Sequence, residues 1–175
     1  MLISSKHTRQ IVDIYILRHG KAEDSPPEGG DASRRLTKKG SEEIVGIGLW
    51  MAAQDLEFDL IAASPLARAQ ETAAIIAGVL DCKKRPLSWD VLVPGSEPDA
   101  VCHEISRHAK SSAILLVGHE PLLSSLISRI ISGNEDAGIA MTKGALAKIR
   151  DVSFTERPSG ELHWLLTAKQ MNFRK

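Results

Sequence analysis

Two arginines and two histidines are the side chains of this sequence whose types and positions could do chemistry. Arg18 and His19 lie in YILRHGKAE, Arg68 lies in SPLARAQET, and His119 lies in VGHEP. A guanidinium is a planar fork that matches the oxygens of a phosphate, and an imidazole is basic enough near neutral pH to attack a phosphorus atom. Brought together, these four residues would suit the binding and transfer of a phosphoryl group.

In each of the three segments, the candidate residues come after a stretch that is typical of a buried strand. The stretches cover residues 11–17, 58–63 and 113–118, and they are short apolar runs rich in strand-forming residues. In open α/β sheets, ligands bind outside the carboxyl ends of the strands. We therefore expect the four side chains to meet at one edge of a sheet and to form an anion site there.

Apolar residues at helical spacing predict the helices that cover this sheet. These helices are expected to begin at about Lys38 with Thr37 as N-cap, at Ser64-Pro65 with the serine as N-cap, at Pro98 and at Pro121. Two of the strand ends run straight into proline-started helices, whose N-terminal amides and dipoles favour an anion. Residues 86–93 have an ambiguous pattern.

The alternation of strands and helices predicts the fold class. It favours a three-layer α/β sandwich with a mainly parallel central sheet and helices on both faces. Near the end, ALAKIRDV and ELHWLLT flank ERPSG, which predicts an antiparallel hairpin at the sheet edge. A chain of 175 residues is long enough for one core and too short for two, so we expect a single domain over 1–175.

Composition argues against several classes of function. Lys and Arg together number 22, as do Asp and Glu, so no basic excess favours nucleic acid. No signal-peptide core and no apolar run long enough to span a membrane is found. Cys82 and Cys102 make no disulfide framework, which favours the cytoplasm. His103 and His108 are five apart on an expected helix, so they lie on different faces and predict no zinc site. The oligomeric state stays open.

The three segments together resemble the histidine phosphatase superfamily, which has the phosphoglycerate-mutase-like fold. RHG closing one strand is a weak signal alone, but SPLARAQET and VGHEP closing two others make the joint signal specific. DASRRLTKKG, KGALAKI and LHWLL are further points of resemblance. Because the chain lacks the large insertions of the mutases and acid phosphatases, it is most similar to the SixA-type phosphohistidine phosphatases.

This resemblance implies a role for each site residue. His19 would be the nucleophile that becomes a phosphohistidine, Arg18 and Arg68 would hold the phosphoryl oxygens, and His119 would complete the pocket. The second ring nitrogen of His19 should donate to a carbonyl, so that the attacking nitrogen stays unprotonated. No metal or cofactor is implied, because the arginines supply the positive charge.

Two acidic positions depart from the family pattern. Many members carry a glutamate after the second helix that protonates the leaving oxygen, and here Glu97 and the neighbouring Asp99 are the nearby candidates for a general acid. A phosphoramidate leaving group needs less help from an acid. Glu120 follows His119 where many relatives have a neutral residue. Its carboxylate would either repel phosphate or turn away to the start of the next helix.

Each of these residues also has a purely structural explanation when taken alone. Arg18 and His19 could form a surface turn, and Arg68 could be a solvated helix arginine. His119 could cap a helix, and Glu97 is more often an exposed acid in a first helical turn. The three motifs together favour the functional interpretation.

The resulting hypothesis is a metal-independent phosphatase that works through His19. The chain has no insertion large enough to form a deep lid, and the segment from Glu23 to Ser33 is the only candidate cover of the site. An open, shallow site favours a phosphorylated protein side chain over a small sugar phosphate, which gains specificity from enclosure. Protein phosphohistidine is therefore the favoured substrate, and a small phosphomonoester or phosphoanhydride is the alternative. A binding module that holds phosphorylated ligands without turnover is the alternative of another class.

Overall fold

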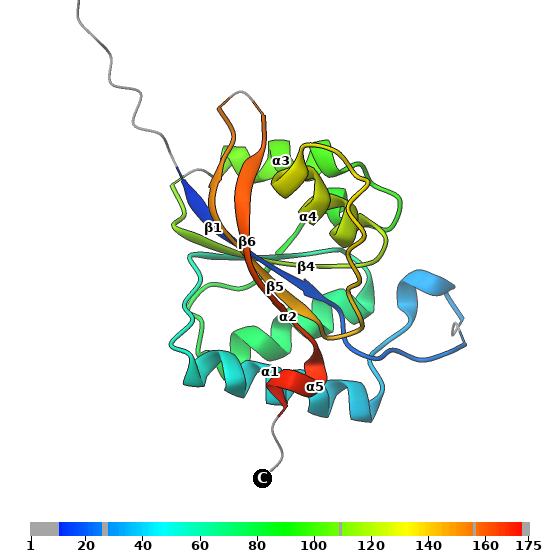
Figure 1. Cartoon of the computed structure of the whole chain (residues 1–175). Coiled ribbons are helices and arrows are strands. Elements are labelled where there is room, and N and C mark those ends of the chain that lie inside the picture. The colour runs from blue at the N-terminus through cyan, green and yellow to red at the C-terminus, as the bar shows by residue number, and fades with distance from the viewer. Residues whose placement is uncertain (1–10, 26–27, 109, 156, 173–175) are drawn as a thin grey trace, which may run out of the picture.

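The structure is a computed structural model, and it describes residues 11–25, 28–108, 110–155 and 157–172. These residues form a six-stranded sheet in the order β3-β2-β4-β1-β5-β6 (Figure 1). The parallel strands are β1 (Val12–Arg18), β2 (Leu60–Ala63), β3 (Leu87–Ser88) and β4 (Ala113–Gly118). β5 (Leu146–Ser153) pairs antiparallel with both β1 and β6 (Ser159–Leu166). The mainly parallel sheet with an antiparallel edge pair is thus confirmed.

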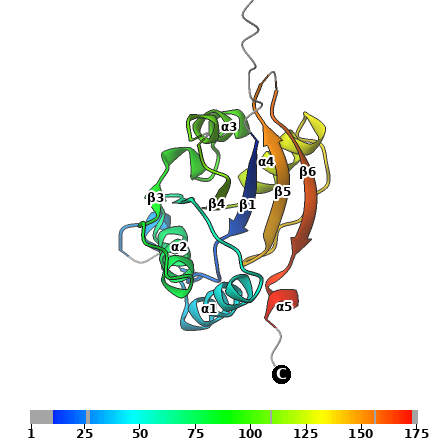
Figure 2. The same ribbon diagram turned by 90° about the vertical axis from the view of Figure 1, so that its left-hand side faces the viewer.

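Helices cover both faces of this sheet, as Figures 1 and 2 show. One face carries α1 (Lys38–Ala53), α2 (Ala67–Val79) and the short α5 (Ala168–Met171), and the other carries α3 (Pro98–Arg107) and α4 (Leu122–Ser132). β1 serves both layers, because alternate side chains of a strand point to opposite faces. Ile14 and Ile16 pack in the core on the α3 and α4 side, whereas Tyr15 and Leu17 pack on the α1 and α2 side.

Most of the expected element boundaries agree with the structure to within two residues. Thr37 is the N-cap of α1, and its Oγ1 accepts a hydrogen bond from the backbone N–H of Gly40 at 3.0 Å. α3 begins at Pro98, and α4 begins one residue after Pro121. The ambiguous residues 86–93 hold β3 and a single 3₁₀ turn, Asp90–Leu92.

The expected N-cap at Ser64 is wrong. α2 begins at Ala67, and Leu66 is its N-cap without a side-chain capping bond. The reason is that the backbone N–H of Ser64 donates to the carbonyl of Val117 at 3.0 Å, which continues the pairing of β2 with β4. The serine therefore belongs to the strand end, and its Oγ accepts only a long bond of 3.4 Å from Leu66 N.

Two further features bear on the expectations from composition. Cys82 and Cys102 are both free thiols. Within the described part of the chain, no helix combines the length and the apolar character that crossing a membrane requires.

Candidate active site

The carboxyl end of β1 brings His19 against His119. β1 and β4 run parallel with Arg18 opposite Gly118, and the backbone N–H of His19 donates to the Gly118 carbonyl at 3.1 Å. His19 follows Arg18 and His119 follows Gly118, so this register places the two histidines side by side. The two imidazole rings consequently lie with their centroids 4.8 Å apart and their planes at 52°.

Arg68 joins them from the first turn of α2, the helix that follows β2. Thr72 ties this turn to the first motif, because its Oγ1 donates to the Arg68 carbonyl at 2.7 Å and accepts from the backbone N–H of Gly20 at 3.2 Å. His19, Arg68 and His119 are 6%, 5% and 2% exposed. The structure thus brings three predicted site residues together in a buried cluster, with Arg18 next to His19.

Gly20 explains why the first motif turns on a glycine. A Cβ at this position would lie 2.7 Å from Cγ1 of Ile44, which is a core residue of α1. Only a residue without a side chain lets the backbone pass this close to the helix. The close passage holds the carbonyl of Gly20 beside the ring of His19.

One hydrogen bond sets the tautomer of His19. Its Nδ1 lies 2.7 Å from the Gly20 carbonyl oxygen, and a carbonyl can only accept, so Nδ1 carries the proton. This leaves the lone pair on Nε2. The carbonyl partner expected for the second ring nitrogen is present.

Both site histidines are uncharged near neutral pH. Burial lowers the pKa of His19 to about 4, and the positive charges of Arg68, Arg18 and Lys143 act in the same direction against the Gly20 hydrogen bond. Burial, followed by the neighbouring His19, lowers the pKa of His119 to about 3. A neutral imidazole with a free Nε2 is the form of histidine that can attack phosphorus.

Three buried nitrogen atoms of the cluster lack a hydrogen-bond partner among the described residues. They are Nε of Arg18 and both ring nitrogens of His119. Arg18 is held by its other end, where Nη1 donates to the Met141 carbonyl at 2.7 Å. Because buried polar atoms are rarely left unpaired, these nitrogens indicate the place of a polar ligand. Beside two guanidinium groups, an oxyanion would supply acceptors for Nε of Arg18 and for the single N–H of the neutral His119 ring.

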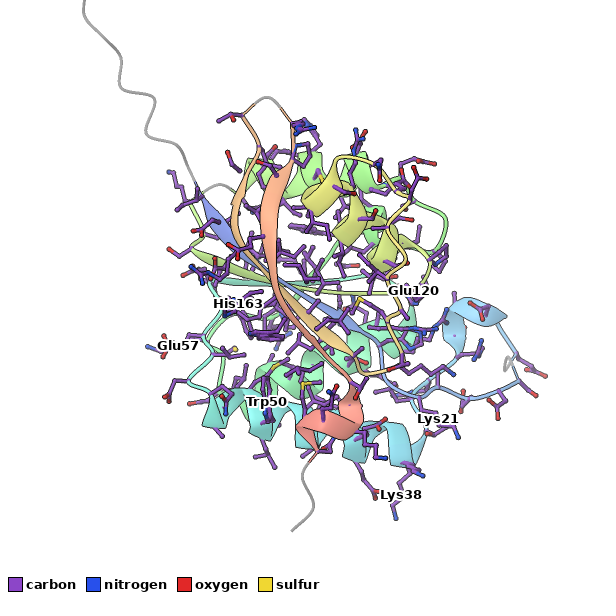
Figure 3. All side chains as sticks on the ribbon, in the orientation of Figure 1. Lys21, Lys38, Trp50, Glu57, Glu120 and His163 are labelled. Atoms are coloured by element: carbon purple, nitrogen blue, oxygen red, sulfur yellow. The ribbon has the colours of Figure 1, made fainter. Side chains whose placement is uncertain are left out.

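The candidate acids do not join this cluster. Asp99 is held by Arg129 through two bonds of 2.7 and 2.9 Å. Glu97 is exposed at the N-cap position of α3, and its side chain makes no hydrogen bond with any described residue, so its role as an acid stays a prediction. Glu120 turns to the start of α4, where Oε1 accepts from the backbone N–H of Ser124 at 3.0 Å (Figure 3). Of the two alternatives for Glu120, the structure therefore favours the helix start.

Two charged residues near the cluster were not predicted from the sequence as site residues. Asp31 contacts the guanidinium of Arg68 through its carboxylate at 2.9 Å and its carbonyl at 2.8 Å. Lys143 precedes β5, and its charge contributes to the low pKa of His19. Asp31 lies in DASRRLTKKG, a point of resemblance to the family, and near the end of the candidate cover Glu23 to Ser33, but the sequence pattern predicts no separate role for its carboxylate. Within the described ranges, no group of three or more histidines, cysteines, aspartates or glutamates is arranged to hold a metal ion.

Comparisons with known proteins agree with this geometry. A model of the histidine phosphatase superfamily (branch 1) matches residues 14–89. Phosphohistidine phosphatase SixA of Escherichia coli (strain K12) is 25% identical over 170 residues, which cover 94% of this chain and 99% of that protein. An uncharacterized protein of Mycobacterium tuberculosis (strain ATCC 25618 / H37Rv) is 32% identical over 128 residues, which cover 71% of this chain and 76% of that protein.

Solved structures show the same fold. The protein histidine phosphatase SixA complexed with tungstate has a TM-score of 0.81 at 21% identity, covering 90% of this chain and 98% of that one. A putative alpha-ribazole-5'-P phosphatase from Escherichia coli K-12 has a TM-score of 0.72 at 20% identity, covering 90% and 97%. The fold is thus common to proteins named for a protein substrate and for a small molecule.

Proposed function

This chain belongs to the histidine phosphatase superfamily, which supports phosphatase activity, and we propose that it hydrolyses its substrate through a covalent phosphohistidine on His19. One observation carries the proposal. A buried His19 with its proton fixed on Nδ1 faces a buried His119 that has no partner for either ring nitrogen among the described residues, next to Arg18 and Arg68. The family resemblance of all three motifs supports the same assignment.

The reaction follows from the roles of these side chains. Nε2 of His19 attacks the phosphorus atom, the bond from phosphorus to the leaving group breaks, and the leaving group departs with the electron pair. Arg18 and Arg68 hold the equatorial oxygens, and His119 donates a hydrogen bond to one of them. Water then attacks the phosphohistidine, the P–N bond breaks, and inorganic phosphate leaves His19 with its lone pair restored.

We propose protein phosphohistidine as the substrate. Asp31, the carboxylate in contact with the cluster, has a pKa held below its ordinary value by Arg34 and Arg68, so it is ionised and has no proton to give. With no protonated carboxylic acid at the cluster among the described residues, a phosphoramidate is a better substrate than an alkyl phosphate. The likeness to a protein named phosphohistidine phosphatase SixA supports this choice, and a small phosphate ester remains the alternative.

The remaining proposals concern the chain as a whole. We propose that residues 1–175 form one domain. A single sheet contains all the strands from β1 to β6, and the match to phosphohistidine phosphatase SixA of Escherichia coli covers 94% of the chain. A cytoplasmic location, with no nucleic-acid or membrane partner, stays a prediction.

A comparison of rates tests the substrate. Turnover of a phosphohistidine-bearing protein, a small phosphoramidate and a panel of sugar phosphates is measured side by side, with His19→Ala as the control. We expect the two P–N substrates to be hydrolysed faster than the sugar phosphates, and all activity to be lost in H19A. Faster turnover of an alkyl phosphate, falling sharply in Glu97→Gln, would show that Glu97 is a general acid and would overturn the substrate choice. A protein that binds phosphate with no turnover would instead be a binding module.

A further inference from the structure

The segment between β1 and α1 is pinned at its base. Ala22 and Leu36 form an antiparallel bridge, and Glu23 and Arg35 are joined by two hydrogen bonds of 3.0 Å, one between backbones and one from Arg35 N to the Glu23 carboxylate. Beyond this base the chain extends outward beside the sheet edge before it returns to α1 (Figure 1). The 3₁₀ turn Asp31–Ser33 lies on the returning part.

Asp31 connects this segment to the candidate active site. One carboxylate oxygen accepts from Nη1 of Arg34 at 2.8 Å, and the other accepts from Nη2 of Arg68 at 2.9 Å. The Asp31 carbonyl accepts from Nη1 of Arg68 at 2.8 Å. Arg34 is itself held, because its Nε donates to the Glu23 carbonyl at 2.6 Å. A continuous chain of contacts therefore runs from the base of the segment to the buried guanidinium.

The guanidinium of Arg68 is hydrogen-bonded to Asp31. Its side chain is 6% exposed, whereas that of Asp31 is 58% exposed, so a surface carboxylate holds a buried cation. Among the described residues, Asp31 is the only one that accepts hydrogen bonds from this guanidinium. A guanidinium has five N–H donors, and Asp31 uses one on each terminal nitrogen. The remaining donors, Nε–H among them, are available to a phosphoryl oxygen.

We propose that Asp31 is a positioning residue of the phosphatase reaction, which sets the direction of the Arg68 guanidinium and is itself placed by Arg34. The inference rests on the proposed function, because it takes Arg68 as a phosphoryl ligand. A donor that is already oriented loses little free energy to reorganisation when charge develops in the transition state. The effect should therefore appear in kcat more than in KM.

Asp31 could instead compete with the substrate for Arg68, and its removal would then have the opposite effect on activity. If the Asp31 carboxylate competed with the phosphoryl group for Arg68, its removal would free the guanidinium and strengthen anion binding. Two substitutions separate the roles. Asp31→Ala removes both the charge and the side-chain acceptor, and Asp31→Asn removes the charge but keeps an oxygen that can accept from Nη2.

The test measures kcat and KM for a phosphoramidate, together with tungstate binding by calorimetry, in wild type, D31A and D31N. The matched control is Asp24→Ala, which removes an exposed carboxylate from the same segment. We expect D31A to lower kcat by about tenfold or more, as misplacement of a catalytic group does. D31N should retain most of the rate, D24A should match wild type, and the melting temperature should change little in all three. In an Arg68→Ala background, D31A should have no further effect.

Several results would overturn this role of Asp31. D31A with wild-type kcat would mean that the contact does not position Arg68, and D31N as slow as D31A would exclude the hydrogen bond as the cause. Faster turnover and tighter tungstate binding in both variants would identify Asp31 as a competitor of phosphate. A wild-type protein with neither turnover nor tungstate binding would overturn the proposed function itself, and this inference with it.

Discussion

The four site residues divide into charged ligands and uncharged imidazoles. Arg18 and Arg68 carry positive charge in the cluster, while burial keeps His19 and His119 neutral by lowering the pKa of each. This division suits phosphoryl transfer, because the nucleophile must have a free lone pair while the transferred group needs fixed positive charge. The hydrogen bond from Nδ1 to the Gly20 carbonyl directs that lone pair to Nε2.

The geometry of Arg68 matters beyond its charge. We expect Arg68→Lys to lower kcat/KM by about a hundredfold, because lysine keeps the charge and loses the bidentate fork. The same change at Arg107, an exposed residue of α3 far along the chain, should leave the rate unchanged. Steady-state kinetics with a phosphoramidate checks both variants. R68K with wild-type kcat/KM would mean that a point charge is enough at this position.

The arrangement of elements accounts for how much of the site could be predicted. His19 and His119 follow strands that pair in parallel register, so side chains far apart in the sequence had to meet at one edge. Apolar periodicity identifies such strands, and this is why the cluster was predictable. Asp31 was not, because its position depends on a turn after Gly29 and Gly30, both with positive φ, and on contacts with two arginines. Neither of these leaves a periodic signal in the sequence.

The start of α2 was misplaced for a related reason. A serine followed by a proline is a common helix start, but here Ser64 is still bonded to β4 through its backbone. The backbone pairing of Ser64 with β4 therefore outweighs the preference of a Ser-Pro pair for a helix start. The consequence for the site is that Arg68 lies in the first turn of α2 rather than in its second.

Thr72 connects α2 to the first motif through the hydrogen bonds of its hydroxyl group. We expect Thr72→Val to lower the free energy of unfolding by about 1–3 kcal/mol, because the buried N–H of Gly20 loses its acceptor. Activity should also fall, since Gly20 places the His19 ring. Thr72→Ser keeps the hydroxyl and serves as the control. Urea unfolding and kcat measured on both variants check this, and equal values for T72V and T72S would show that the hydroxyl is not needed.

For the whole molecule, the buried neutral histidines make stability depend on pH. The ordinary pKa of 6.5 applies in the unfolded chain, whereas the folded values are about 4 for His19 and about 3 for His119. At pH values between the folded and the unfolded pKa of each histidine, the unfolded state binds more protons than the folded state. The free energy of unfolding therefore has its full value above pH 6.5 and falls as the pH is lowered. The two buried histidines of the candidate active site thus lower the stability of the fold at acid pH.

We expect the free energy of unfolding to fall by about 2 kcal/mol or more between pH 7 and pH 5, where most carboxylates are still ionised. Urea unfolding at the two pH values measures this. His19→Asn should reduce the difference, and the same change at the exposed His103 should leave it intact. An equal difference in wild type and H19N would mean that His19 does not titrate in this range.

The most direct test of the account is to trap the phosphorylated enzyme. The protein is mixed with a phosphoramidate, quenched in base, digested and analysed by mass spectrometry, with the H19A variant treated in parallel. We predict a phosphoryl group on the peptide that contains His19, stable in base and lost in acid, and none in H19A. Turnover by H19A, or a phosphoryl group at another residue that forms as fast as the substrate is consumed, would contradict the central claim that His19 is the nucleophile.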